Sequence, residues 1–462
     1  DLAWSRGLGD VYKRQAANEA LALRYAQYDQ LTQLPNRDSL LDELAARMRD
    51  ARQTQQRLAL LLVDLDQFKK VNDRLGHKLA DRILQRAAER LQNNNPGAFV
   101  ARISSDEFAL LLPLPSDAGN DWLQQQAASQ HRCLARPFEL GDPPISLTAT
   151  IGVAVYGGGA ENPTDLLGHA DLALHGGKSG TETRTQIYQP GMREQVRERL
   201  GIEARIQGAL ESGEFQAYYQ PVLDLATEQV VSFEALIRWF PASGEPIYPD
   251  QFIPLAEHTG QIVELGRWML VEVGQQLAQW RSQGRRQSSV AVNVSLRQLR
   301  GGQLVHDLRE CLRMNRLPGD AIKLEITETA MMENVEDTAE QLLAVQALGV
   351  QISIDDFGTG FSSLAHLKQL PVDELKIDRS FVSDLSTNAQ SRKIVASIVN
   401  MAHALELRTV AEGVEDQDSI RLLKALGCDR VQGYYYAKPM AADALLRDGW
   451  LRTAPPQAAG QN

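Results

Sequence analysis

The sequence predicts a mixed α/β protein whose second half folds as a TIM-type β/α barrel. In that half, short apolar stretches such as VVSFE and VQISIDD alternate with apolar-periodic stretches long enough for crossover helices. Strands that alternate with helices indicate parallel βαβ units, and polar residues at successive strand ends are typical of a TIM-type active site. The chain has 462 residues, which is too long for one ordinary core, so we expect two domains.

The predicted strands of the second half end in residues that can bind a metal ion or a substrate. These residues are Glu234, Asn293, Glu325, Asp355, Asp356, Lys376, Glu412 and Gln432. Oxygen ligands without His or Cys favour Mg²⁺ or Mn²⁺ over Zn²⁺. The residues alone therefore predict a metal-dependent hydrolase.

The motifs around these residues resemble the EAL domain of cyclic di-GMP phosphodiesterases, over roughly residues 197–446. A lone Glu-Ala-Leu tripeptide carries little information, whereas seven motifs in the family's order leave little room for a chance match. The motifs are EALIR (234–238), NVS (293–295), EITE (325–328), DDFG (355–358), LKID (375–378), AEG (411–413) and QGY (432–434). The resemblance implies hydrolysis of cyclic di-GMP to linear pGpG.

The resemblance also implies two Mg²⁺ or Mn²⁺ ions, which activate a water molecule and clamp the phosphate. The expected ligands are Glu234, Asn293, Glu325 and Asp355 for one ion, and Asp355, Asp356 and Glu412 for the other. Two adjacent carboxylates would repel each other without a cation and one pKa would rise. An Asp pair at a strand end in this context therefore favours a metal site over a loop or a helix cap.

By the same resemblance, Lys376, Glu412, Glu328 and Glu234 form the catalytic set. Lys376 orients the attacking water and neutralises charge, although a salt bridge to a buried carboxylate is its alternative role. Glu412 is a general base or a metal ligand, and the sequence does not separate these roles. Glu328 steadies the loop FGTGFSSL (357–364), which in the family links metal occupancy to dimerisation. A homodimer through the EAL domain is therefore expected.

Three further residues are expected to bind the substrate. Gln220 resembles the family's first-strand contact, and Arg238 suits the non-scissile phosphate through its planar guanidinium. Gln432 holds a water or Glu412, or it simply ends its strand.

The first half resembles the GGDEF domain of diguanylate cyclases over about residues 26–188, which implies a cyclase-like α/β palm domain. The strand LALLLVDLD ends in an acid, and FVARISSDEFALLL forms a hairpin with two acids in its turn. By resemblance, Asp64 and Asp106 bind metal with the Leu65 carbonyl, while Asn72 and Asp81 bind guanine. The full set of site residues is Asp64, Leu65, Asn72, Asp81, Asp106, Glu107 and Lys178.

Departures from the family pattern predict that this cyclase is inactive. Ser104 and Ser105 replace two glycines of the turn, so two Cβ atoms crowd the place expected for the GTP phosphates. Glu182 replaces an arginine and would repel phosphate, Ala80 replaces a glycine, and the inhibitory RxxD motif is absent at 95–98. GTP could still bind here as a regulator, and the alternative is a domain that only makes dimer contacts.

Three alternatives to a phosphodiesterase stay open: a silent cyclic di-GMP receptor, a scaffold, and a bifunctional enzyme with residual cyclase activity. A net charge of −11 argues against a partner among nucleic-acid polymers. The longest apolar run, Leu58–Val63, is too short to span a membrane. Three scattered cysteines fit a reducing bacterial cytoplasm, with an upstream membrane tether left open.

The remaining segments flank these domains. Residues 1–15 match neither domain and are interpreted as a non-native or unassigned segment, and residues 16–30 resemble a signalling helix. Residues 189–210 are expected to form a helical linker between the two domains. The Pro- and Ala-rich tail, residues 447–462, is expected to be disordered.

Overall fold

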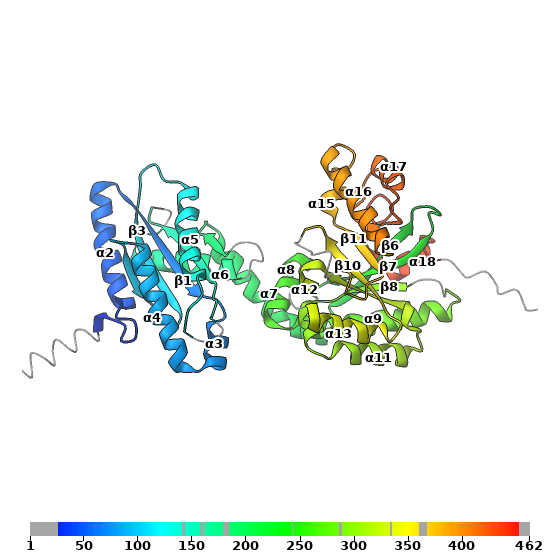
Figure 1. Cartoon of the computed structure of the whole chain (residues 1–462), viewed down its shortest axis with the longest axis horizontal. Helices are drawn as coiled ribbons and strands as arrows, with labels where there is room; N and C mark the ends of the chain where they lie inside the picture. Colours follow the sequence, from blue (N-terminus) through cyan, green and yellow to red (C-terminus); the bar gives the residue numbers. More distant parts are fainter. Residues whose placement is uncertain are drawn as a thin grey trace, which may run out of the picture. The chain divides into compact units, whose positions relative to one another are not determined.

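The computed structural model divides the chain into two compact units, residues 1–200 and 201–462, and each is considered by itself (Figure 1). The structure describes residues 26–140, 144–157, 160, 162–178, 184–242, 244–285, 289–332, 335–359 and 367–451. The segment 1–15, residues 16–25 of the expected signalling helix and residues 452–462 of the expected tail therefore lie outside the described residues. Where the structure describes these segments, the expectations are wrong: Tyr28 pairs with Pro35 instead of continuing a helix, and residues 447–451 end α18 (Ala442–Arg447) and bury Leu451 against the core.

The first unit is built on a five-stranded sheet with the order β2-β3-β1-β4-β5. Its strands are β1 (Arg57–Leu65), β2 (Phe99–Arg102), β3 (Glu107–Leu114), β4 (Ala149–Val155) and β5 (Thr185–Ile187). All neighbouring pairs are antiparallel except β4 and β5. The predicted hairpin at 99–112 is confirmed as the β2–β3 pair.

Helices cover both faces of this sheet. They are α2 (Arg37–Thr54), α3 (Phe68–Leu75), α4 (His77–Asn94), α5 (Asn120–Ala135) and α6 (Pro163–Lys178). Side chains alternate along a strand, so Leu61 and Val63 of β1 pack with α4 and α5, whereas Leu60 and Leu62 pack with α2 and α6. β1 is therefore buried on both sides, as its continuous apolar sequence predicts.

The second unit contains a closed barrel of eight strands. The strands are β6 (Phe215–Asp224), β7 (Val230–Trp239), β8 (Ser289–Asn293), β9 (Ile322–Thr327), β10 (Gln351–Phe357), β11 (Glu374–Ile377), β12 (Arg408–Ala411) and β13 (Arg430–Val431). Pairing of β13 with β6 closes the ring, and β14 (Met440–Ala441) adds to the edge of β6.

The predicted barrel differs from an all-parallel TIM barrel at its first strand. β6 is antiparallel to both neighbours, β7 and β13, whereas β7 to β13 are parallel to one another. Only residues 225–229 connect β6 to β7, and a parallel crossover would need a dozen or more residues. The mixed α/β class is confirmed, and the strictly parallel arrangement is wrong at this strand.

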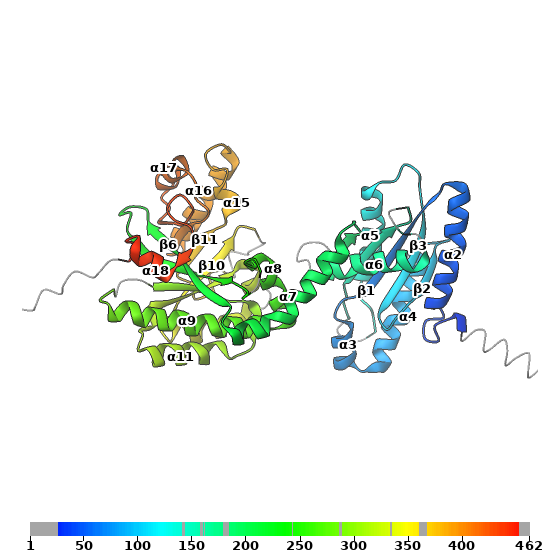
Figure 2. The ribbon, with the colours of Figure 1, turned by 180° about the vertical axis from the view of Figure 1, so that it is seen from behind.

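Helices surround the barrel (Figures 1 and 2). They are α7 (Met192–Ser212), α8 (Pro249–Thr259), α9 (Ile262–Ser282), α10 (Leu296–Arg300), α11 (Leu304–Asn315), η1 (Gly319–Ala321), α12 (Glu328–Met332), α13 (Val335–Gln346), α15 (Arg379–Val382), α16 (Ala389–Ala404), α17 (Gln417–Ala425) and α18 (Ala442–Arg447). The apolar faces of the helices from α9 onward and the strand side chains that face them form the main core, whereas α7 and α8 pack with Phe215 and Trp239 in a separate cluster. Within the described part of the chain, no helix combines the length and apolarity that a membrane span requires.

Candidate active site

Lys376 lies at the centre of the barrel mouth, with only 1% of its side chain exposed. Its Nζ is 2.8 Å from Glu325 Oε2, 3.1 Å from Asp355 Oδ1 and 2.6 Å from Glu412 Oε1. A fourth carboxylate, that of Glu234, is 3.6 Å away. Four strands or strand ends thus direct acids at one ammonium group, as the strand-end pattern predicts.

Glu234 is held by neutral hydrogen-bond donors as well as by the lysine. The Nδ2 of Asn293 donates to its Oε1 at 2.8 Å, and the Nε2 of Gln432 donates to its Oε2 at 2.6 Å. Glu234 and Gln432 are both buried, whereas Asn293 is exposed at the end of β8. The structure therefore brings these three predicted site residues into direct contact, and the acid that Gln432 holds is Glu234 rather than the expected Glu412.

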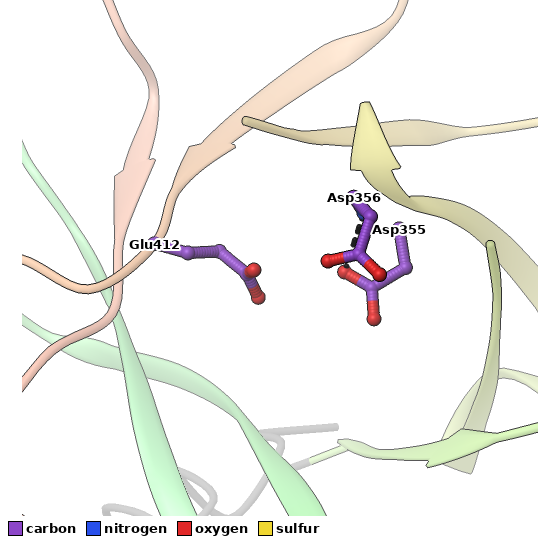
Figure 3. Close-up of side chains that lie close together, drawn as sticks. All are labelled: Asp355, Asp356 and Glu412. Carbon is purple, nitrogen blue, oxygen red and sulfur yellow. Dashed lines mark hydrogen bonds between the residues drawn. The ribbon is translucent and has the colours of Figure 1, made fainter. Parts of the chain in front are cut away.

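A bulge in β10 places Asp355 and Asp356 on the same side. Neighbouring residues of a regular strand point to opposite faces, but the pairing with β11 shifts register between Ile354 and Phe357. Asp356 has a φ of 54°, which is uncommon for a residue other than glycine. Figure 3 shows the two carboxylates side by side with Glu412 extending toward them, and oxygens of the three lie within 4.8 Å of one another.

The other predicted residues of this site lie around the cluster. Glu328 is buried and accepts a hydrogen bond of 2.8 Å from the Gly358 backbone, at the start of the loop 357–364. Residues 360–364 of that loop lie outside the described residues. Gln220 faces Glu234 across the β6–β7 pair. Arg238 is half-buried on β7, with its guanidinium carbon 5.8 Å from the Tyr218 ring centre.

The acids predicted in the first unit meet at one end of its sheet. Asp64 pairs with Glu107 across β1 and β3, and the Leu65 amide donates to the Asp106 carbonyl. Asn72 and Asp81 come from α3 and α4, respectively, and Asp81 is exposed. The Asn72 Oδ1 is buried and accepts no hydrogen bond from a described residue. Lys178 ends α6, but its side chain and Glu182 lie outside the described residues.

The two serines of the hairpin turn engage these acids directly. Ser104 Oγ donates to Glu107 Oε2 at 2.9 Å, and Ser105 Oγ donates to Asp106 Oδ1 at 2.5 Å. Glycines at these positions would leave both carboxylates free of such bonds. The serine hydroxyls therefore contact Asp106, which the resemblance implies as a metal ligand, and its neighbour Glu107.

Comparison with known families assigns both units. An EAL domain model matches residues 203–439, and a diguanylate cyclase, GGDEF domain model matches residues 26–184. The chain is a GGDEF–EAL tandem protein.

Two relatives from one bacterium align with nearly the whole chain. The bifunctional diguanylate cyclase/cyclic di-GMP phosphodiesterase MucR of Pseudomonas aeruginosa is 36% identical over 93% of this chain and 62% of its own length. The cyclic di-GMP phosphodiesterase NbdA of the same organism is 35% identical over 93% of this chain and 55% of its own length. The chain thus spans about half to three fifths of these relatives.

Solved structures are similar to the GGDEF–EAL chain as well. The PaMucR phosphodiesterase in a c-di-GMP complex is 39% identical, covers 53% of this chain and 99% of its own, and has a TM-score of 0.52. The S helix-GGDEF-EAL part of Vibrio cholerae LapD covers 91% of this chain and 99% of its own with a TM-score of 0.56. Its identity is 19%, so this second likeness shows the fold alone.

The buried charges of the EAL site perturb one another. Burial lowers the pKa of Lys376, but the surrounding acids outweigh this and raise it well above its ordinary value. Burial, with Asp355 and Glu234 nearby, raises the pKa of Glu412 to about 8. Desolvation and the carboxylates of Asp355 and Asp378 raise the pKa of Asp356 to about 6. Without a divalent cation, the site therefore retains protons that an ion would displace.

These shifts predict how metal-free stability depends on pH. Glu412 and Asp356 have folded pKa values above their unfolded ones, so the folded state binds more protons between about pH 4 and 8. The free energy of unfolding contributed by these groups is therefore lost as pH rises through that window. We expect the thermal midpoint in chelator to fall from pH 5 to 8, and added Mn²⁺ to raise it most at pH 8.

The matched control for this prediction is Glu412→Gln, whose side chain is neutral at every pH. It should show a shallower fall of the midpoint with pH than the wild type. Equal slopes for the two proteins would contradict the assignment of the retained proton to Glu412.

A second layer of buried charges lies below the site and was missed by the sequence analysis. Lys323 Nζ donates to Glu374 Oε1 at 2.5 Å, Arg430 NH1 contacts Glu374 Oε2, and Ser353 Oγ is 3.4 Å from Glu374 Oε1. Each of these residues precedes a residue of the upper cluster by two positions, as in Lys323-Leu-Glu and Glu374-Leu-Lys. Polar residues at i and i+2 in an apolar strand were the signal, because both face the barrel interior.

Proposed function

We propose that the EAL unit hydrolyses cyclic di-GMP to linear pGpG with Mg²⁺ or Mn²⁺. The observation that carries this proposal is the group of four carboxylates that surround Lys376 at the barrel mouth. NbdA is named a cyclic di-GMP phosphodiesterase, and the PaMucR phosphodiesterase structure is a c-di-GMP complex. The family relationship therefore supports the same substrate here.

The donor set fits divalent cations that prefer oxygen ligands. Oxygens of Asp355, Asp356 and Glu412 already converge within 4.8 Å. The buried Gln432 Oε1 accepts no hydrogen bond from a described residue. The residues that would hold two ions are Glu234, Asn293, Glu325, Asp355, Asp356 and Glu412. When bound, such ions lower the pKa of water and offset charge on the phosphate.

Lys376 and Glu412 supply the proton and charge chemistry in this proposal. The ammonium of Lys376 donates hydrogen bonds at the centre of the acids and is suited to orient the attacking water. The Glu412 carboxylate lies 2.6 Å from the Lys376 ammonium, so it is placed to accept a proton from a water that this ammonium orients. We therefore assign Glu412 as the general base, with metal ligation as its second role.

Arg238 is proposed to bind the non-scissile phosphate. It lies four residues beyond Glu234 on the same face of β7, which places it nearer the mouth of the barrel. Its guanidinium lies near the Tyr218 ring, and a planar fork of donors matches two phosphate oxygens. The exposed rings of Tyr434 and Tyr435 add apolar surface on the nearby segment after Gln432.

Glu328 is proposed to maintain the geometry of the Asp pair. Its carboxylate accepts from the Gly358 amide, two residues after Asp356. Gly358 has a φ of 102°, and a Cβ there would come within 2.8 Å of the Phe381 ring. The turn therefore needs glycine at position 358, and the hydrogen bond from its amide to Glu328 holds the backbone after the Asp pair in place.

The GGDEF unit is proposed to lack cyclase activity. Ser104 and Ser105 donate hydrogen bonds to the carboxylates of Glu107 and Asp106, respectively. We therefore expect the Ser104→Gly/Ser105→Gly variant to bind GTP with Mg²⁺ more tightly than the wild type. Calorimetry on the full chain measures this difference. The control Ser104→Ala/Ser105→Ala keeps both Cβ atoms but removes the hydroxyls, which separates crowding from competition. Equal GTP affinity in all three proteins would contradict this account.

Comparison of Glu234→Ala with Glu228→Ala tests the phosphodiesterase. Glu228 is an exposed partner of Lys424 on the same unit and lies outside the site. We expect pGpG from the wild type and Glu228→Ala in Mn²⁺, but none from Glu234→Ala. Equal rates for the two variants would contradict the proposal. A regulatory GTP, a homodimer through the EAL unit and a cytoplasmic location remain predictions from the sequence.

A further inference from the structure

Two buried glutamines lie beside the carboxylate of Glu234. Gln220 is on β6, Gln432 directly follows β13, and Glu234 is on β7, so the three come from adjacent parts of the closed barrel. Their exposed fractions are 6%, 4% and 6%, respectively. Side chains so enclosed need hydrogen-bond partners inside the protein.

The hydrogen bonds among them start from Gln432, whose side-chain nitrogen donates to both of the other side chains, and Gln220 donates onward to the backbone. Gln220 Nε2 donates to the Ala437 carbonyl at 3.0 Å, and Gln220 Oε1 accepts from Gln432 Nε2 at 2.9 Å. Gln432 Nε2 also donates to Glu234 Oε2 at 2.6 Å. A carbonyl and an ionised carboxylate can only accept, so both ends of this series fix the orientation of the two amides.

Gln220 also joins two points of one turn. The Ala437 amide donates to the Gly433 carbonyl, and the Gln432 amide donates to the Ala411 carbonyl. A Cβ at Gly433 would come within 2.1 Å of the Val414 carbonyl, so this turn is tightly packed. Gln220 bonds to the Gln432 side chain at the start of the turn and to the Ala437 backbone carbonyl at its end, so it ties the turn to β6.

We propose that Gln220 is a positioning residue that sets the Glu234 carboxylate for a divalent cation through Gln432. This inference rests on the proposed function and refines it. The resemblance predicts that Gln220 contacts the substrate, but both polar atoms of its amide bond to the protein instead. Without Gln220, the Gln432 amide is free to turn and to present its oxygen to Glu234, which would displace the carboxylate.

The test measures Mn²⁺ binding separately from cyclic di-GMP binding, using the full chain. Gln220→Met keeps the side-chain volume and removes both polar atoms. We expect Gln220→Met to weaken Mn²⁺ binding about 10- to 100-fold, as loss of an outer partner of a metal ligand does. At saturating Mn²⁺, its KM for cyclic di-GMP should stay within about twofold of the wild type.

A second variant guards against misfolding of the first. Gln220→Glu still offers an oxygen to Gln432, and its carboxyl group, kept protonated by burial beside Glu234, still offers a donor to the Ala437 carbonyl. We expect its Mn²⁺ affinity to be closer to the wild type than that of Gln220→Met. A large rise in the KM of Gln220→Met with unchanged Mn²⁺ affinity would overturn the proposal and indicate that Gln220 contacts the substrate. No change in either quantity would overturn the proposal as well. Mn²⁺ titration without substrate tests the positioning role independently of catalysis. If the wild type shows no turnover, the proposed function is wrong, but the Mn²⁺ affinities of the variants still test the role of Gln220.

Discussion

Replacing Lys376 by methionine is expected to lower the rate of cyclic di-GMP hydrolysis by about 10²- to 10³-fold, the usual loss when one buried donor that stabilises developing charge is removed. Methionine preserves the length of the side chain but not its charge. Four carboxylates within 3.6 Å then lose their shared counter-charge. Steady-state kinetics in saturating Mn²⁺ measure the effect.

Stability separates the chemical role of Lys376 from its structural one. In chelator, the thermal midpoint of Lys376→Met should fall, because the uncompensated acids repel one another. Excess Mn²⁺ should restore the midpoint but not the rate. Lys424→Met, at an exposed ion pair with Glu228, serves as the control and should change neither. A rate within tenfold of the wild type in Mn²⁺ would show that Lys376 acts only as a salt bridge.

Replacing Glu374 by leucine is expected to destabilise the EAL unit by about 3–5 kcal/mol, since removal of one partner leaves buried charges unpaired. Glu374 is 3% exposed and holds both Lys323 and Arg430. Burial raises the pKa of Glu374, but these two cations outweigh it and keep the carboxyl ionised. The measurement is the midpoint of thermal unfolding, expected to fall by roughly 10 °C.

Glu310→Leu provides the comparison for this prediction. Glu310 forms an ion pair with Arg313 on the exposed face of α11, where solvent screens the interaction. Its midpoint should stay close to that of the wild type. A shift for Glu374→Leu no larger than that for Glu310→Leu would contradict a structural role for the lower layer.

The grouping of the acids at one end of the barrel was predictable, because it follows from the alternation of side chains along a strand and from the parallel order of the strands. Glu325 and Asp355 lie two residues before the ends of β9 and β10, and parallel neighbours bring such ends together. The expected strand end at Glu234 is wrong, because β7 continues to Trp239. The antiparallel β6 was also visible in principle, because residues 225–229 leave no room for a crossover helix. The expectation of parallel βαβ units rested on the alternation of strands and helices and did not take this short connection into account.

Backbone exceptions and long-range contacts were not predictable in the same way. Asp356 faces the site only because a bulge and a positive φ reverse its direction, and the residue types alone do not specify either. The contact from Gln220 to Ala437 spans 217 positions and depends on closure of the barrel. Similarly, substitution by Ser104 and Ser105 predicts crowding, whereas their bonds to the turn acids appear only in three dimensions.

The most direct test of the central claim is to strip the full chain of metal with chelator and then restore Mg²⁺ or Mn²⁺ in the presence of cyclic di-GMP. Bound nucleotide and pGpG are measured in the same samples. The account predicts that pGpG forms only after the ion is restored. Cyclic di-GMP that binds and stays intact at saturating metal would contradict it and would identify the EAL unit as a receptor.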